Sequence, residues 1–216
     1  MTVTTLPIDQ PARPSARDCV IKNLEVKNPR IACARFENFE AHTPAQQAAL
    51  EVAQQYAEEA REWNHGGDWL YLAGFAGTGK THLAVAATIA IGYWGTEFVT
   101  ASELIDEIKK SFTRRYTDEP TTEDIKRKYL DARLLVIDDL GAGQRGTEFE
   151  SALLSDLLCE RYRGTWATII TTNLGGSQMT EFLGQRVVDR IEEVARKVEF
   201  TWDSYRRGSR RRRGQP

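Results

Sequence analysis

The sequence predicts an α/β protein in which a parallel sheet of five strands lies between two layers of helices. Two observations lead to this fold class. From residue 69 onward, short apolar runs bounded by turn residues alternate with longer segments typical of helices, which is the pattern of parallel strands joined by right-handed crossovers. The first apolar run also ends in a glycine-rich turn that opens a helix, a tight connection that glycine makes sterically possible.

The N-terminal region lacks a clear pattern. Residues 1 to about 34 mix proline, threonine and arginine with isolated apolar residues and show no periodicity. We therefore expect residues 1–35 to form an extended or partly disordered arm. The globular domain is predicted to span residues 36–203, and residues 204–216 are expected to form an arginine-rich tail.

The first clearly predicted helix begins at a capping sequence. Thr43 can cap the helix, Pro44 suits its first position, and Gln46 stands three residues after the cap. The helix should run to about Trp63, because an asparagine and two glycines follow closely.

Strands and helices then alternate to the end of the domain. The predicted strands are Trp69–Ala73, Glu97–Thr100, Leu134–Ile137, Thr168–Thr172 and Lys197–Thr201. The predicted helices between them are Lys80–Ile91, Ser102–Phe112, Thr147–Arg163 and Gln178–Val194, with a short helix, Thr122–Leu130, inserted before the third strand.

Composition favours one cytoplasmic domain with tails. The chain has 216 residues, of which 41% are hydrophobic and 28% charged, and no apolar run approaches the ~20 residues of a membrane span. The first ten residues lack the basic start of a secretory signal. The net charge of −2 conceals a basic C-terminus, so we expect any nucleic-acid contact to be local. The arginines there are Arg206, Arg207, Arg210, Arg211, Arg212 and Arg213.

The segment Gly74–Thr81 fits the P-loop pattern at every fixed position, directly after a buried strand and at the start of a helix. In this motif the glycines let backbone N–H groups surround the phosphates of ATP, Lys80 reaches the terminal phosphates, and the Thr81 hydroxyl binds Mg²⁺. A chance match has odds of order 10⁻² in a chain of this length. The residues expected to contact ATP are Gly74, Ala76, Gly77, Thr78, Gly79, Lys80, Thr81 and His82.

Two carboxylates end the third predicted strand, as in a Walker B motif. Asp138 is expected to hold the Mg²⁺ shell with Thr81, and Asp139 to orient or deprotonate the attacking water. An apolar strand with trailing acids is structural about half the time when taken alone. The P-loop upstream makes the functional interpretation the stronger one.

Two further candidates depend on that context. Asn173 ends the fourth strand and could touch the γ-phosphate or the attacking water, although asparagine there is more often a turn residue. Arg186 and Arg190 share one helix face and could both reach an anion. Spacing alone favours an ordinary solvated face for them, because acidic residues stand nearby.

Basic and aromatic residues gather around the inserted helix. Phosphate contacts and base stacking could bind single-stranded DNA there, but interspersed acidic residues make an ordinary solvated surface equally plausible. The residues expected to contact DNA are Lys109, Lys110, Arg114 and Arg115.

Five segments together resemble the DnaC/DnaI replicative helicase loaders and the related IstB transposition ATPases, over roughly residues 36–206. The most specific is the closing Trp-Asp-Ser-Tyr-Arg stretch, which is more similar to DnaC than to IstB. The segments are Gly74–Thr81, Leu135–Gly141, Ile169–Leu174, Leu183–Ile191 and Trp202–Arg206.

This resemblance implies an AAA+ ATPase fold with sheet order 5-1-4-3-2. It implies that Arg186 and Arg190 act as arginine fingers on a neighbouring subunit's ATP in a homo-oligomer, which reverses the interpretation from spacing. It also places the inserted basic helix along a single-stranded DNA path, and Phe36–Phe39 beside the adenine. Asp139 stands where AAA+ proteins usually have glutamate, and we expect no helical lid domain after the fifth strand.

The function expected from the resemblance is that of an ATP-dependent loader, which binds single-stranded DNA and helps place a replicative, DnaB-like ring helicase on it. The alternative is an IstB-like transposition helper that acts on duplex DNA. A small-molecule P-loop kinase is a third candidate, but the paired arginines and the Asn173 strand argue against it.

Overall fold

The computed structural model describes residues 14–62, 67–112, 119–142 and 147–205. Within them, five parallel strands form one sheet in the order β2-β3-β4-β1-β5. Read from the other edge, this is the order 5-1-4-3-2 expected from the family resemblance. The strands are β1 (Trp69–Gly74), β2 (Thr96–Thr100), β3 (Leu134–Leu140), β4 (Ala167–Thr172) and β5 (Ala195–Phe200).

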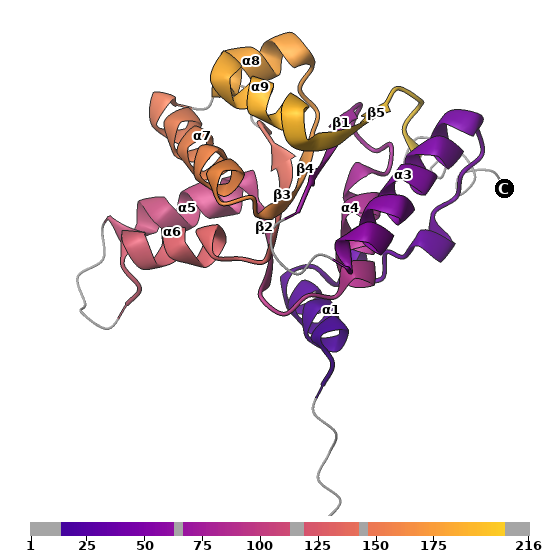
Figure 1. Cartoon of the computed structure of the whole chain (residues 1–216), viewed down its shortest axis with the longest axis horizontal. Coiled ribbons are helices and arrows are strands. Elements are labelled where there is room, and N and C mark those ends of the chain that lie inside the picture. Colours follow the sequence, from indigo (N-terminus) through magenta and orange to yellow (C-terminus); the bar gives the residue numbers. More distant parts are fainter. Residues whose placement is uncertain (1–13, 63–66, 113–118, 143–146, 206–216) are drawn as a thin grey trace, which may run out of the picture.

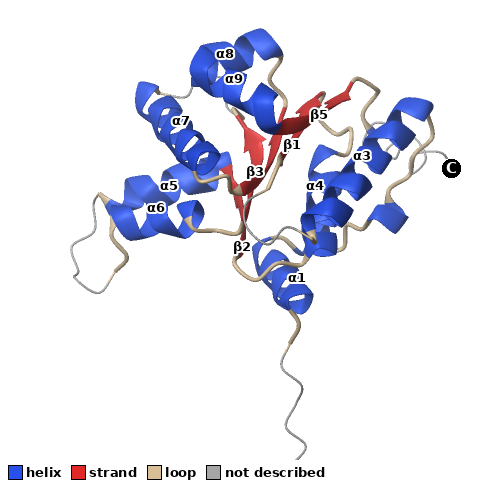
Figure 2. Cartoon of the chain, viewed as in Figure 1, coloured by secondary structure: helices blue, strands red, loops and turns tan. Residues whose placement is uncertain are grey.

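Helices cover both faces of the sheet and confirm the three-layer architecture (Figures 1 and 2). One layer comprises α1 (Ala16–Lys27), α2 (Pro29–Ala32), the short 3₁₀ helix η1 (Phe36–Asn38), α3 (Pro44–Ala60) and α4 (Lys80–Ile91). The other comprises α5 (Ala101–Ser111), α6 (Thr122–Leu130), α7 (Glu148–Arg163), α8 (Gly176–Leu183) and α9 (Gln185–Val194).

Alternation along the strands divides the apolar side chains into two cores. In β1, Leu70 and Leu72 pack with the layer of α1 to α4, whereas Trp69 and Tyr71 pack with the layer of α5 to α9. This period of two is the ordinary geometry of a strand that is buried on both faces. None of the helices in the described part of the chain is long and apolar enough to cross a bilayer.

The expected extended arm is wrong for residues 14–34, which form α1 and α2. Ser15 caps α1 in a capping box with Asp18, and Val20 and Leu24, four residues apart, are buried against the core. Two buried residues are too few to give a visible helical periodicity, so the sequence pattern missed a helix that tertiary contacts stabilise. Residues 1–13 lie outside the described part.

The expected helix Gln178–Val194 is divided into α8 and α9 at Gly184. Gly184 has φ +81°, outside the helical region and readily adopted by glycine alone. The fifth strand also starts earlier than expected, because β5 follows α9 directly. These two differences give α9 its own direction, which matters because it carries Arg186 and Arg190.

A buried arginine joins the second helical layer to the sheet. Arg161 of α7 is fully buried, and the hydrogen bonds from its guanidinium compensate for the loss of hydration. Its acceptors are the carbonyl oxygens of Tyr129, Leu130, Ala132 and Ala167 and the hydroxyl of Thr168, at 2.6–3.0 Å.

The parallel register brings the chemistry-bearing residues to one edge of the sheet. Gly74 of β1 lies beside Phe200 of β5, and Leu140 of β3 beside Thr172 of β4. The β3–β4 ladder is irregular between Ile137 and Leu140. The P-loop, the two aspartates and Asn173 therefore meet at the carboxyl ends of the strands, where ligands bind in open α/β sheets.

Candidate nucleotide-binding site

The P-loop has the backbone that a phosphate cradle requires. Gly74, Gly77 and Gly79 all have positive φ, at +135°, +78° and +106°, a region that other residues adopt only with strain. Space is also restricted at Gly79, where a Cβ atom would lie 2.7 Å from Phe39 Cε2. Only glycine fits at Gly79, both for its backbone and for its neighbour.

Lys80 is the first residue of α4 and is only 5% exposed. Its ammonium donates hydrogen bonds to the carbonyls of Gly74 and Phe75, at 2.9 and 2.7 Å, and to Asn173 Oδ1 at 2.7 Å. The charge is thereby held between the P-loop and the end of β4, at the position from which it can face terminal phosphates.

Thr81 and Asp138 form the expected metal-binding pair. The Thr81 hydroxyl lies 2.9 Å from Asp138 Oδ1, and the Thr171 hydroxyl donates to the same oxygen at 2.6 Å. Burial, as the largest cause, raises the pKa of Asp138 above its usual value, opposed by the Thr171 bond. A hard cation prefers such oxygen ligands and reaches full coordination with phosphate oxygens and water, so the pair fits Mg²⁺ beside a bound nucleotide.

Asp139 lies next to this pair in an unusual backbone conformation. Its φ is +54°, one of two positive values among the described non-glycine residues. Thr171 Oγ1 accepts a hydrogen bond from its N–H at 2.9 Å, and Asn173 Nδ2 donates to its carboxylate at 3.4 Å. Strain of this kind persists where surrounding contacts hold it, and here it turns the carboxylate toward the open pocket that Asp139 lines.

A pocket of about 480 Å³ adjoins the P-loop, within the range of nucleotide and cofactor sites. Seven of the eight expected ATP contacts, the residues from Ala76 to His82, line this pocket. Gly74 instead accepts the Lys80 bond and adjoins β5. Phe39 packs edge-on to His82, which bonds to the Arg35 carbonyl at 2.8 Å.

Sequence reasoning missed part of this pocket. Its far wall comes from α2 and the residues that follow, and from the end of the described chain. The family resemblance placed Phe36–Phe39 beside the adenine, and it gave Trp202–Arg206 only as a family motif, without a place at the site. The missed lining residues are Arg30, Ile31, Ala34, Glu40, Gln46, Trp202 and Tyr205.

The two arginines of α9 have different surroundings. Arg190 donates to Cys159 Sγ at 2.5 Å and lies over the Tyr162 ring, 5.1 Å from its centroid, so it contacts α7 of its own chain. Arg186 is exposed, and among the described residues it has no hydrogen bond or ion pair. Of these two arginines, Arg186 is therefore the one without a partner in the described part of its own chain.

The expected DNA-contact residues are only partly described. Lys109 and Lys110 are exposed at the end of α5, and Lys109 pairs with Glu150 at 2.6 Å. Exposed Phe112 contacts Phe149 edge-on beside them. Arg114 and Arg115 lie outside the described residues.

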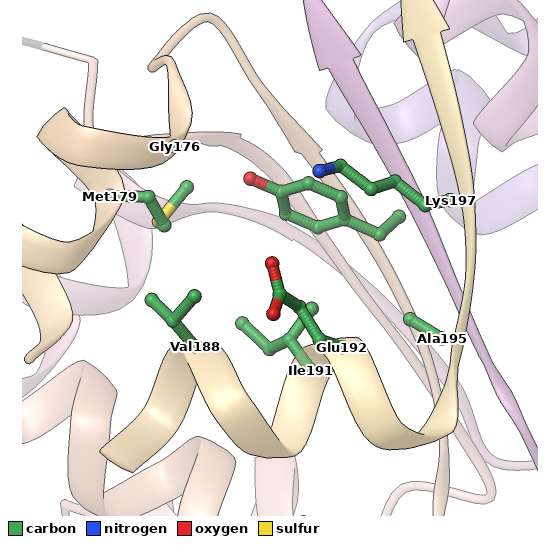
Figure 3. A pocket seen from close by; sticks show the side chains of 8 residues that line it. Gly176, Met179, Val188, Ile191, Glu192, Ala195 and Lys197 are labelled. Atoms are coloured by element: carbon green, nitrogen blue, oxygen red, sulfur yellow. The ribbon is translucent and has the colours of Figure 1, made fainter. Parts of the chain in front are cut away.

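A second cavity, of about 180 Å³, shares no lining residue with the nucleotide pocket. Figure 3 shows Met179 of α8 and Val188 of α9 on one side and Lys197 of β5 on the other. None of the residues predicted to act on nucleotide or DNA lines this cavity.

Comparison with known proteins agrees with this geometry. The profile of the family described as "IstB-like ATP binding protein" matches residues 32–213. The "Replicative helicase loader DnaC" of Escherichia coli (strain K12) is 31% identical over 174 residues, which cover 79% of this chain and 68% of that protein.

Solved structures give the same result. The "Crystal structure of the DnaC helicase loader" superposes with a TM-score of 0.68 and 28% identity, covering 79% of this chain and 98% of that one. "Replication initiator DnaA bound to AMPPCP and single-stranded DNA" superposes at 0.63 with 20% identity, covering 82% of this chain and 51% of that one, which supports the fold alone. The chain therefore belongs to the IstB-like family of ATP-binding proteins, AAA+ ATPases that are related to the DnaC helicase loaders.

Proposed function

We propose that the chain is a cytoplasmic helicase loader that uses ATP, binds single-stranded DNA and helps place a replicative ring helicase on it. The observation that carries this proposal is the convergence of Lys80, Thr81, Asp138 and Asn173 at one edge of the sheet, in a chain 31% identical to the loader DnaC.

The proposed chemistry is hydrolysis of the bond between the β- and γ-phosphates of ATP, in which water attacks the γ-phosphorus and ADP leaves. The N–H groups of the P-loop and the Lys80 ammonium hold the phosphates, and Asn173 contacts the γ-phosphate or the attacking water. Asp139 orients that water and accepts its proton. The Asn173 amide fixes the Asp139 carboxylate through the bond at 3.4 Å. Aspartate is one methylene shorter than glutamate, so we expect slow turnover.

Thr81 and Asp138 would hold Mg²⁺, which neutralises charge on the β- and γ-phosphates. The Thr81 hydroxyl donates a hydrogen bond to Asp138, and the Thr171 hydroxyl donates to the same carboxylate. Thr81 and Asp138 therefore lie close enough together to serve one cation. Asp138 has to be ionised to bind it, against the burial that raises its pKa.

The site is completed in our proposal by a second copy of the chain. Arg186 of a neighbouring subunit contacts the γ-phosphate in the ATP-bound homo-oligomer and stabilises charge in the transition state. Its exposure and lack of a described partner within its own chain support this assignment. Arg190 instead holds α9 against α7, which makes it a supporting residue.

Single-stranded DNA is assigned to the surface formed by Lys109, Lys110 and exposed Phe112. Arg114 and Arg115 follow in the sequence, outside the described residues, and are the further residues that we expect to contact the strand. Aromatic stacking and phosphate contacts would bind a strand without sequence preference. A transposition helper that acts on duplex DNA is the alternative, because the family model that matches this chain is described as IstB-like.

One experiment tests the loader proposal against that alternative. Affinity for single-stranded and duplex DNA of equal length is measured with and without ATP at several salt concentrations. We expect ATP-dependent preference for the single strand, and a weaker affinity and flatter salt slope for Arg114→Glu/Arg115→Glu. Preference for duplex DNA would favour the transposition helper. If the variant kept the parent's DNA affinity and salt slope, this surface would not be the DNA-binding surface.

A further inference from the structure

The residues that follow β5 form hydrogen bonds with the P-loop, and two of them, Trp202 and Tyr205, also line the nucleotide pocket. We call residues 201–205 the strap. Trp202 Nε1 donates a hydrogen bond to the Thr78 carbonyl at 3.0 Å, and the Tyr205 backbone N–H donates to the Gly77 carbonyl at 2.9 Å. The Trp202 ring stacks on Phe200, with centroids 4.7 Å apart. The strap therefore connects the sheet edge to the loop by two polar contacts and one aromatic contact.

These two carbonyls belong to the peptide groups that matter most for phosphate binding. The Gly77 carbonyl shares its peptide group with the Thr78 N–H, and the Thr78 carbonyl with the Gly79 N–H. In a trans peptide the carbonyl and the N–H point in opposite directions, and the described residues contain no cis bond. With both carbonyls directed at the strap, both N–H groups point away from it, and Thr78 and Gly79 line the pocket.

A hydrogen bond accepted by a carbonyl also polarises its peptide group. Polarisation makes the N–H at the other end a stronger donor, by about 10–30% per bond in condensed-phase estimates. No described residue accepts a hydrogen bond from either N–H, so both are available to an anion. The strap thus orients the N–H groups of Thr78 and Gly79 and makes them stronger hydrogen-bond donors, although these groups belong to the P-loop.

We propose that Trp202 and Tyr205 are positioning residues of the nucleotide site, and that docking of the strap and binding of the phosphates strengthen one another. The proposal rests on ATP binding at the P-loop. Thermodynamic reciprocity links the two events: if docking of the strap raises the affinity for nucleotide by some factor, bound nucleotide raises the equilibrium constant for docking by the same factor. Arg206 follows Tyr205 directly in the sequence, so a protease that cuts after arginine has a cleavage site beside the strap.

Two substitutions each remove one strap bond. Trp202→Phe deletes the indole N–H but keeps a ring on Phe200, and Tyr205→Pro deletes the backbone N–H. Tyr205→Ala is the matched control for the lost side chain, and Trp94→Phe, at a tryptophan 60% exposed and outside the pocket, controls for tryptophan loss. One neutral hydrogen bond corresponds to about a 3- to 10-fold change in affinity.

The affinities to measure are those for Mg-ATP and for magnesium tripolyphosphate, which has no base. We expect Trp202→Phe and Tyr205→Pro to bind both about 3- to 10-fold more weakly, by equal factors for the two ligands. Trp94→Phe should bind tripolyphosphate like the parent, and Tyr205→Pro should bind it about 3- to 10-fold more weakly than Tyr205→Ala, which keeps the backbone N–H. If the variants lost affinity for Mg-ATP but not for tripolyphosphate, the strap would contact the base and not position the phosphate-binding N–H groups, and the proposal would be wrong. Unchanged affinity for both ligands would also overturn it. Normal ATP binding by Lys80→Ala would instead refute the nucleotide site itself.

Docking of the strap is measured separately by trypsin cleavage at the Arg206–Arg207 bond, followed by mass spectrometry. Saturating ATP should slow this cleavage in the parent by about the same 3- to 10-fold, because a protease that cuts the undocked form reports its population. In Tyr205→Pro, cleavage should be faster and less sensitive to ATP. A rate in the parent that ATP does not change would contradict the coupling.

Discussion

Lys80 Nζ lies 2.7 Å from Asn173 Oδ1, so the first residue of α4 is joined to the residue that follows β4. The same amide reaches Asp139 with its nitrogen. One neutral side chain thus stands between the cation that binds phosphate and the acid proposed to orient water. Its neutrality matters because a charge at this point would change the potential that the phosphates meet.

Replacing Asn173 tests this arrangement. Asn173→Asp places a carboxylate beside Lys80, where it competes with the γ-phosphate, and we expect ATP affinity to fall at least 10-fold, with a smaller loss for ADP. Asn173→Ala, the uncharged control, should bind ATP within about 3-fold of the parent but hydrolyse it on the order of 100-fold more slowly. Nucleotide affinities and single-turnover rates measure both effects. Equal ATP affinity in the two variants would show that charge at this position is unimportant.

The two neighbouring aspartates should give separable defects. Asp138→Asn removes a proposed Mg²⁺ ligand, so nucleotide binding should lose its dependence on Mg²⁺. Asp139→Asn should keep Mg²⁺-dependent binding while turnover stops. Titrations with ATP in the presence of Mg²⁺ or EDTA, combined with hydrolysis rates, distinguish the two. If both variants lose binding alike, the division of roles between them is wrong.

The pKa of Asp138 predicts a dependence of stability on pH. Burial raises this pKa in the folded protein, so the folded state holds the proton more tightly than the unfolded chain does. The group therefore costs no stability below its ordinary pKa and becomes destabilising as pH rises through the raised value. Without Mg²⁺, Asp138→Asn should melt at a temperature similar to the parent at about pH 3.5 and a few degrees higher at pH 7. A melting temperature below the parent at pH 7 would contradict this sign.

The arginines of α9 should differ when subunits are mixed. Arg186→Ala should melt like the parent, bind ATP normally and lose hydrolysis stimulated by assembly. Arg190→Ala should lower the melting temperature, because it loses contacts with Cys159 and Tyr162. Titrating Asp139→Asn protein into Arg186→Ala at fixed total concentration, with single-stranded DNA, should restore part of the activity. If the proteins co-assemble without recovery, Arg186 does not act on a neighbour's ATP.

Arg161 should be the residue of α7 most sensitive to substitution. Arg161→Met is similar in length but leaves four buried carbonyls and a hydroxyl without their donor. We expect a loss of about 3–5 kcal/mol in the free energy of unfolding. Exposed Arg163→Met on the same helix should change it by less than about 0.5 kcal/mol. Urea denaturation measures both, and equal stabilities would show that the buried hydrogen bonds contribute little.

The core of the nucleotide site could be predicted from sequence because it is local. Glycines at fixed spacing, a lysine and a threonine form one turn, and the strands before and after it are marked by apolar runs. Asp138 and Asn173 could be added because parallel strands end at one edge, whatever the details of packing. Local sequence patterns were therefore sufficient to predict the P-loop and the residues at the ends of β3 and β4.

The rest depends on contacts that spacing does not encode. Arg30 and Tyr205 reach the pocket from segments at the two ends of the described chain, carried there by packing on α4 and by the end of β5. Spacing placed Arg186 and Arg190 on one face, but their different surroundings depend on where α7 lies. Gly184 could have indicated the division of α8 from α9, because an interior glycine weakens a helix.

The N-terminal helices have a mechanical consequence. α1 and α2 pack on α4 through Val20, Leu24 and Ala32, and the segment that follows them forms one wall of the nucleotide pocket. A pulling force applied at residue 14 would first load the contacts of α1 and α2 with α4, and then the boundary between this wall and the P-loop. A nucleotide that contacts both sides of that boundary would raise the force needed to separate them. Force from a partner attached at this end of the described chain would therefore reach the nucleotide pocket only after the packing of α1 gave way.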